Sequence, residues 1–243
     1  SGNTTAAMVR DCVVGKCLNF DGTDDRITTA NSLAYSNELT VSLWVRTTYA
    51  GSEGYPFDWN SNTFAPQLDL WFASGQVGAK LRDDASNQVI LVADGIYNDS
   101  VWHSFVMVRN GNNFYLYVDG IQNKSGSVGF GAFTSRPINL GDYPVLGRPF
   151  QGSVDSVHVF NRTLSASEVW ELYTLEYNRT GRGNQGFVQN FTNVSLALRA
   201  KNYSFNDSGL VGWWDLGDSS DNETAANKTL DLSGNGNDGT GVS

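Results

Sequence analysis

Cys12 and Cys17 are the only cysteines of the chain, and four residues separate them. The intervening stretch includes Gly15, and this spacing suits a tight hairpin whose flanking residues face each other at disulfide distance. In an oxidising compartment we expect the two thiols to form a disulfide. A ring this small contributes roughly 2 kcal/mol, which fixes the hairpin locally. Because a zinc site needs four ligands and neither another cysteine nor a histidine lies nearby, a metal centre is not expected here.

Asn-x-Ser/Thr triplets, the acceptor sites of N-glycosylation, are unusually dense. A chain rich in Ser, Thr and Asn would contain some of them by chance, but this density indicates a glycoprotein that is exported and faces the outside of a cell. The eleven triplets begin at Asn3, Asn98, Asn123, Asn161, Asn178, Asn190, Asn193, Asn202, Asn206, Asn222 and Asn227.

Residues for nucleophilic catalysis are scarce. His103 and His158 are the only histidines and follow the pattern of outward-facing strand residues, and no Gly-x-Ser-x-Gly elbow is present. We therefore expect no enzyme.

Charge and hydropathy exclude two further classes. The net charge is −9 with only 16 Lys and Arg, so binding to nucleic acid or to an anionic membrane surface is not expected. No apolar run approaches the roughly 20 residues that a membrane span needs. Because the chain starts at Ser1 without a signal-peptide pattern, we expect a processed product or a piece of a longer protein.

Short alternating strands separated by turns dominate residues 12–160. Alternation of apolar and polar residues is clear at 41–45, 68–72, 89–92, 105–108 and 114–118, and Asp-Gly and Asn-Gly pairs at 94–95, 110–111 and 119–120 predict turns. This pattern is typical of an all-β sandwich or jelly roll. One helix is predicted to begin after Ser165, a capping residue matched by Glu168, and to end near Tyr173.

Four stretches, in order and with family-like spacing, resemble the laminin-G-like domains of the concanavalin-A-like lectin superfamily. They are GKCLNFDGTDDRI at 15–27, LTVSLWV at 39–45, VWHSF with FYLYVDG at 101–105 and 114–120, and the closing strand and helix at 146–173, which contains GSVDSVHVFNR. The resemblance implies an antiparallel jelly-roll β-sandwich over residues 1–177. It also implies non-catalytic binding, because the Glu-x-Asp-x-x-Glu strand of the related glucanases is absent.

One segment is displaced relative to that family. A strand such as LVGWW followed by LSGNGNDGT normally precedes the opening hairpin, but here it forms residues 209–243, after a sequon-rich connector at 178–208 that we expect to hold a strand at 194–200. Burying its apolar side chains is worth on the order of 10 kcal/mol, so the segment must enter a core. Its interface residues are Leu210, Val211, Trp213, Trp214, Leu216, Leu230 and Leu232.

Three arrangements of the displaced segment are consistent with its position at the end of the sequence. The segment completes its own sandwich, or it enters the next subunit of a head-to-tail filament, or the chain is one repeat of a longer array. We favour the filament or array, a homopolymer of the chain on a cell surface, over a self-completed lectin-like adhesion module that binds carbohydrate.

The resemblance also implies candidate ligand sites. Asp21, Asp24, Asp25 and Asp155 occupy positions where relatives bind Ca²⁺, although Asp21 with Gly22 also fits a plain turn, and Asp155 a residue that binds backbone amides. Sugar binding would need exposed rings beside amides, and no sugar-binding residue is assigned. An aromatic residue in such a fold is more often part of the core or of an interface than of a sugar site. The loop candidates are Tyr55, Trp59, Asn60, Asn62 and Tyr143.

Overall fold

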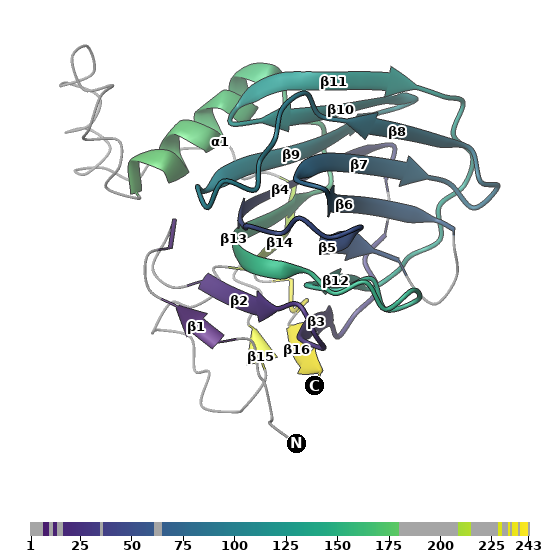
Figure 1. Cartoon of the computed structure of the whole chain (residues 1–243). Helices are drawn as coiled ribbons and strands as arrows, with labels where there is room; N and C mark the ends of the chain where they lie inside the picture. The colour runs from purple at the N-terminus through teal and green to yellow at the C-terminus, as the bar shows by residue number, and fades with distance from the viewer. Residues whose placement is uncertain are drawn as a thin grey trace, which may run out of the picture.

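In the computed structural model, two antiparallel sheets pack face to face (Figure 1). The residues described are 7–9, 12–13, 17–34, 36–60, 65–179, 209–214, 228–229, 233, 235–237 and 239–242. The connector at 180–208, and with it the strand predicted at 194–200, lies outside them. So do Leu216, Leu230 and Leu232.

Sheet A has eight strands. Their order is β1 (Ala7–Val9), β2 (Cys17–Asp21), β13 (Gln151–Phe160), β4 (Glu38–Arg46), β9 (His103–Asn110), β10 (Asn113–Val118) and β11 (Ile121–Ser127), with β14 (Leu210–Trp214) also paired to β13.

Sheet B also has eight strands. Their order is β15 (Lys228–Thr229), β16 (Gly239–Val242), β3 (Arg26–Thr29), β12 (Ile138–Leu140), β5 (Gly54–Trp59), β6 (Gln67–Ala73), β7 (Gln76–Arg82) and β8 (Gln88–Val92). The all-β sandwich predicted from the sequence is therefore confirmed.

The core lies between the inner faces of the two sheets. Alternate residues of each strand point inward, as the two-residue period of a strand requires, and they exclude solvent. Among the fully buried inner side chains are Leu43, Phe57, Leu70, Phe72 and Phe105.

The helix α1 (Ala166–Arg179) covers part of the outer face of sheet A (Figure 1). The predicted capping box is present: the Glu168 carboxylate accepts the Ser165 N–H at 2.8 Å, and the Ser165 hydroxyl accepts the Glu168 N–H at 3.3 Å. The helix runs past the predicted end at Tyr173. A contact with a residue distant in sequence stabilises the additional turn: Glu176 accepts the Trp44 indole N–H at 2.6 Å. A local sequence pattern does not contain this information. No helix in the described part of the chain has the length and apolar character of a membrane span.

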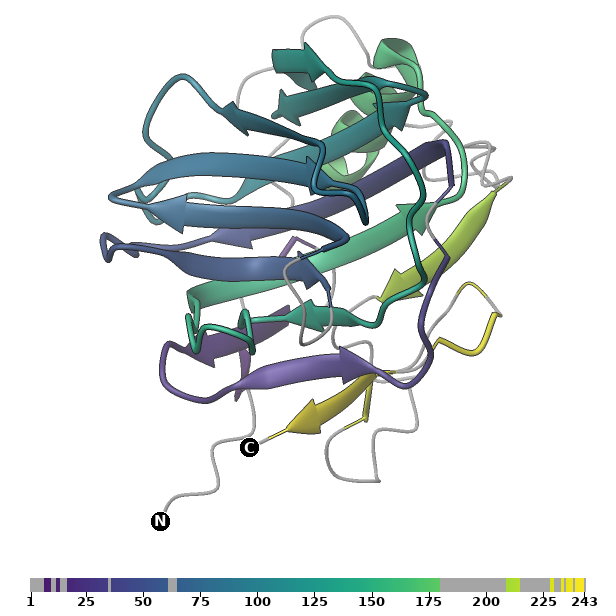
Figure 2. The same cartoon turned by 90° about the vertical axis from the view of Figure 1, so that its right-hand side faces the viewer.

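The C-terminal strands join both sheets of the same chain. Figure 2 shows β14 alongside β13 and β16 beside β3. The outer edge of β13 is divided between two strands, because β2 pairs with 151–154 and β14 with 157–160. In this single chain, the displaced segment therefore completes its own sandwich.

Candidate functional sites

Asp21, Asp24 and Asp25 lie together at the rim of the sandwich, where β2 ends. One carboxylate oxygen of each lies within 4.8 Å of those of the other two. Asp21 Oδ1 accepts the Thr23 N–H at 2.7 Å, and Asp25 Oδ2 accepts the Asp21 N–H at 3.0 Å. Asp25 is buried, and its Oδ1 has no hydrogen-bond partner. Burial raises the pKa of Asp25, and the negative charges of Asp21 and Asp24 raise it further.

This rim cluster fits part of a calcium site. Hard cations take six to eight oxygens, of which the trio supplies three, so water or ligand hydroxyls would complete the shell. The positive φ of Gly22 (83°) and the Asp21 to Thr23 bond also make a tight turn here. Both interpretations of Asp21 from the sequence thus have a structural basis, and calcium binding stays a prediction.

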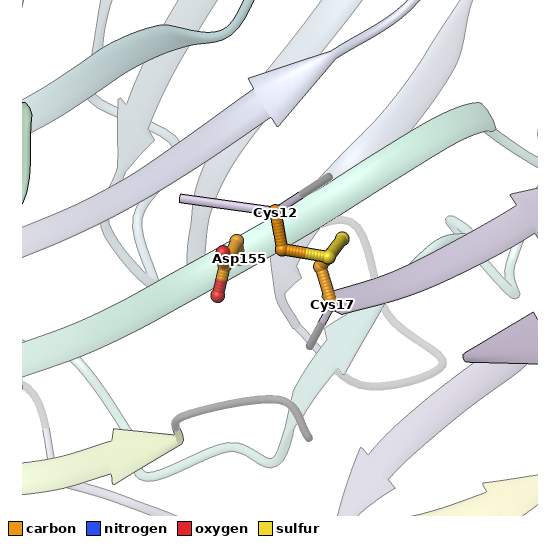
Figure 3. Close-up of side chains that lie close together, drawn as sticks. All are labelled: Cys12, Cys17 and Asp155. Atoms are coloured by element: carbon orange, nitrogen blue, oxygen red, sulfur yellow. A yellow bond between two sulfur atoms is a disulfide. The ribbon is translucent and has the colours of Figure 1, made fainter. Parts of the chain in front are cut away.

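Asp155 does not join the rim cluster. Figure 3 shows it beside Cys12 and Cys17, which form the predicted disulfide. Its Oδ2 accepts the Val13 N–H at 2.8 Å, and its Oδ1 accepts the Ser156 N–H at 2.7 Å. The buried carboxylate therefore binds backbone amides and fixes the disulfide loop onto β13, as in the second interpretation of this residue. Because the two sulfurs are bonded to each other, the group is not a metal site.

A polar pocket of about 520 Å³ opens next to the rim cluster. Its floor is a row of directly paired strand residues, Asn19 on β2, Ser153 on β13 and Arg46 on β4. The Arg46 guanidinium lies 5.0 Å from the ring centroid of Trp102, and Asp21 forms another wall. A pocket with one cation, one carboxylate and several amide or hydroxyl groups suits a polyhydroxylated ligand better than an apolar one.

The aromatic residues proposed from the sequence for sugar binding are not available to a ligand. Tyr55 and Trp59 lie in β5 rather than in a loop, and they are buried, as are Asn60 and Tyr143. The amide groups of Asn60 and Gln67 instead donate to the Tyr143 hydroxyl. These side chains pack as internal structure. Asn62 lies outside the described residues.

Sequence reasoning missed a charged row on sheet B. Asn139, Asp58, Asp69 and Lys80 occupy directly paired positions on β12, β5, β6 and β7. Asn139 Nδ2 donates to Asp58 Oδ2 at 3.0 Å, and Lys80 Nζ lies 3.0 Å from Asp69 Oδ2. Both aspartates are 0% exposed. An acidic residue inside an otherwise apolar strand, as in Leu68-Asp69-Leu70, was the available signal.

The two histidines have separate partners. The prediction that both face outward is wrong for His103, because it lies on the same side of β9 as the core residue Phe105 and is paired with the core residue Val45. His103 Nδ1 lies 2.8 Å from Asp119 Oδ2 and its Nε2 lies 3.3 Å from Asp99 Oδ1, so the ring joins the loop at 94–101 to the end of β10. His158 is on the outer face of sheet A as predicted, but α1 covers it, and its Nδ1 lies 3.5 Å from Glu176 Oε1.

Three predicted glycosylation sites have described side chains. Asn161 is exposed at the end of β13, whereas the amide nitrogens of Asn98 and Asn123 donate to Tyr49 O at 3.1 Å and to the Tyr97 hydroxyl at 3.4 Å. Asn178 lies in α1. The side chains of the remaining seven (Asn3, Asn190, Asn193, Asn202, Asn206, Asn222 and Asn227) lie outside the described residues, and glycosylation stays a prediction.

The sandwich defines a jelly-roll protein of the lectin-like class. A family model of the concanavalin A-like lectin/glucanases superfamily matches residues 21–170, which is more than half of the chain. The chain belongs to this superfamily, as the sequence resemblance predicted. No curated protein matches it.

Several solved structures share the fold. A heptameric SAP-like pentraxin from Limulus polyphemus superposes with a TM-score of 0.57 and 16% identity over 69% of this chain and 86% of its own. The binding domain of Paraclostridial Mosquitocidal Protein 1 gives 0.57 and 17% over 71% of this chain and 46% of its own. The binding domain of botulinum neurotoxin serotype D gives 0.57 and 14% over 70% and 45%. This chain thus spans less than half of either toxin domain.

Proposed function

We propose that the chain is a glycosylated, non-catalytic subunit of an extracellular filament or repeat array, in which residues 209–243 of one copy complete the sandwich of the next. One observation carries the proposal. The displaced strands β14 and β16 are added to two strand edges, at residues 157–160 of β13 and 26–29 of β3, with which no other described strand pairs. Such edges accept a strand by hydrogen bonding alone.

The donor segment makes the same contacts whether it comes from its own chain or from a neighbour. The segment between α1 and β14 comprises residues 180–209, and 30 residues span up to about 100 Å when extended. Either sandwich is therefore within reach. Head-to-tail donation is a heterologous contact that propagates into a fibre when its rotation does not close. An oxidising exterior is compatible with the Cys12–Cys17 disulfide.

A cross-link between β3 and β16 tests the proposal. Thr28 and Thr240 are directly paired, and the described residues contain no free cysteine. In Thr28→Cys/Thr240→Cys, donation between chains predicts a ladder of covalent multimers on a denaturing, non-reducing gel, which collapses to monomer on reduction. The single variant Thr240→Cys should give no ladder.

Cross-linked monomers without a ladder would mean that each chain completes itself, and the filament proposal would be abandoned. Electron microscopy of the same sample provides the independent readout. Fibres whose reduced subunit has the mass of one glycosylated chain support strand donation between separate subunits, whereas a far larger chain would indicate tandem repeats.

A second candidate is a carbohydrate-binding adhesion module, and the polar rim pocket favours it. Ligand hydroxyls would contact Asn19, Ser153 and Arg46, and calcium on the rim cluster would bridge the ligand to the protein. A glycan array read with calcium and with chelator tests it, with Arg46→Ala as the site variant and Arg136→Ala as a control outside the pocket. Failure of the wild-type chain to bind any glycan in either condition would reject the module.

A further inference from the structure

The buried row of Asp58, Asp69 and Lys80 on sheet B places the Lys80 amine beside the Asp69 carboxyl group, where little water can reach them. Asp58, Asp69 and Lys80 all point away from the core, because their strand neighbours Phe57, Leu70 and Ala79 point into it. They are nevertheless shielded from water. The Lys80 side chain is 17% exposed, and those of both aspartates are fully covered.

Aromatic side chains provide part of this shield. The Trp71 indole lies over Gly78, its paired residue on β7, where any larger side chain would collide with the ring. Tyr55 packs 6.4 Å from Trp71 and 5.0 Å from Tyr143, measured between ring centroids. Burial raises the pKa of both tyrosines, and the charges of Asp58 and Asp69 raise it further, so the rings and the carboxyl groups share one environment.

Ionised forms of Asp58, Asp69 and Lys80 are unfavourable in this buried environment. Burial raises the pKa of Asp69, and it raises the pKa of Asp58 well above its usual range, with the negative charge of Asp69 adding to the effect. The side chains of Asp58 and Asp69 hydrogen-bond to each other. A buried ion pair is often no more stable than a neutral group of the same size, because both ions lose their water. A reaction that removes both charges would relieve this cost.

We propose that Lys80 and Asp69 condense to an intramolecular isopeptide bond, with Asp58 as the proton carrier, which covalently joins β6 to β7. The reacting nitrogen already lies 3.0 Å from the carboxyl oxygen. Such fixed proximity is worth many orders of magnitude in rate. Exclusion of water also opposes the reverse hydrolysis.

The chemistry balances without any co-reactant. A proton moves from the Lys80 ammonium to the Asp69 carboxylate, which leaves an amine beside a carboxylic acid. The Lys80 nitrogen then attacks Asp69 Cγ. Asp58 donates its proton to the departing oxygen and receives one from the nitrogen, so the C–O bond breaks, one water molecule leaves and a neutral amide remains. Asp58 ends in its starting state and is catalytic in the strict sense, because it exchanges protons with the reacting atoms.

Peptide mapping of the purified full-length chain tests the bond directly. Trypsin cuts after Lys and Arg, so the unmodified chain yields peptide 47–80, which contains no Asn-x-Ser/Thr triplet and no Asp-Gly pair. An isopeptide bond blocks cleavage after Lys80. The expected product is therefore peptide 47–82 with a mass about 18 Da below its sequence value, and with no fragment ions from within the ring formed by residues 69–80.

Three variants assign the roles. Lys80→Arg and Asp58→Asn should both restore the full mass of the region, with folding checked by circular dichroism. Lys124→Arg, which changes an exposed lysine paired with Asp94 at 2.8 Å, should keep the light peptide. Release of wild-type peptide 47–80 at full mass would overturn the proposal, and this result does not depend on any variant folding. A light peptide from Asp58→Asn would overturn the role of Asp58.

Discussion

The two acidic clusters of this molecule contain similar residues in opposite environments. Asp21 and Asp24 at the rim are exposed to water, whereas Asp58 and Asp69 on sheet B are completely buried. The rim cluster is open to a cation from solution, because several of its oxygens are accessible. The buried cluster instead faces the Lys80 amine of its own chain, and its neighbours keep water out. Environment, rather than residue type, thus distinguishes the calcium binding proposed at the rim from the covalent bond proposed on sheet B.

Removing the Lys80 amine should have the largest effect. Lys80→Met removes the proposed bond to Asp69 and leaves two carboxyl groups buried without the amine that faces them, so we expect a loss of about 3–5 kcal/mol in the free energy of unfolding. Urea denaturation measures it. Lys124→Met, at an exposed pair, should cost at most about 1 kcal/mol.

The double variant Asp69→Leu/Lys80→Met distinguishes a lost charge from lost packing. Both variants lack the Lys80–Asp69 bond, so they differ in whether the Asp69 carboxyl group stays buried without its amine. The double variant should therefore recover the part of the stability that was lost to the unpaired carboxyl group. A double variant as unstable as Lys80→Met would show that the loss comes from packing or from the missing bond rather than from an unpaired carboxyl group.

The pH dependence of stability should reveal Asp58. Its folded pKa is raised, so its contribution is fully present below the unfolded value, about 3.9, and is lost as pH rises through the folded value. Stability therefore falls between acidic and neutral pH, and Asp58→Asn should flatten this part of the profile. Unfolding free energies at a series of pH values measure it. A wild-type profile that the variant leaves unchanged would mean that Asp58 is not a buried titrating acid.

Calcium should distinguish the exposed cluster from the buried one. If the rim trio binds Ca²⁺, a concentration of ten times Kd stabilises the fold by about 1.4 kcal/mol, or about 3–5 °C in Tm. Asp25→Asn should abolish the shift, while Asp58→Asn should keep it. Thermal melts with calcium and with chelator make the comparison. If calcium did not raise the Tm of the wild-type chain, Asp21 and Gly22 would be interpreted as a turn and not as part of a metal site.

Alternation along the chain was sufficient to predict β4, β6, β8, β9 and β10, because each has apolar residues at every second position. It did not predict β5 or β7, whose Pro56, Gly78 and Lys80 are unusual in strands. The disulfide could be predicted because its two ends are close in sequence. The buried row could not, since Asp58, Asp69 and Lys80 meet only through the register of three strands, which no local pattern fixes.

The smallest effect on stability is expected for His103, whose exposure is intermediate between those of the two acidic clusters. Its side chain is 15% exposed, Asp119 and Asp99 contact its two nitrogens, and Tyr97 packs against the ring. Burial alone would lower its pKa, but the hydrogen bond and charge of Asp119, with help from Asp99, raise it overall. The stabilisation is then complete below the unfolded value of about 6.5 and is lost as pH rises through the folded value. His103→Gln should remove this slope near neutral pH and leave the acidic slope of Asp58 intact. If both slopes disappeared together, the histidine and the buried row would be energetically coupled through β9 and sheet B, and the two environments could not be treated as independent.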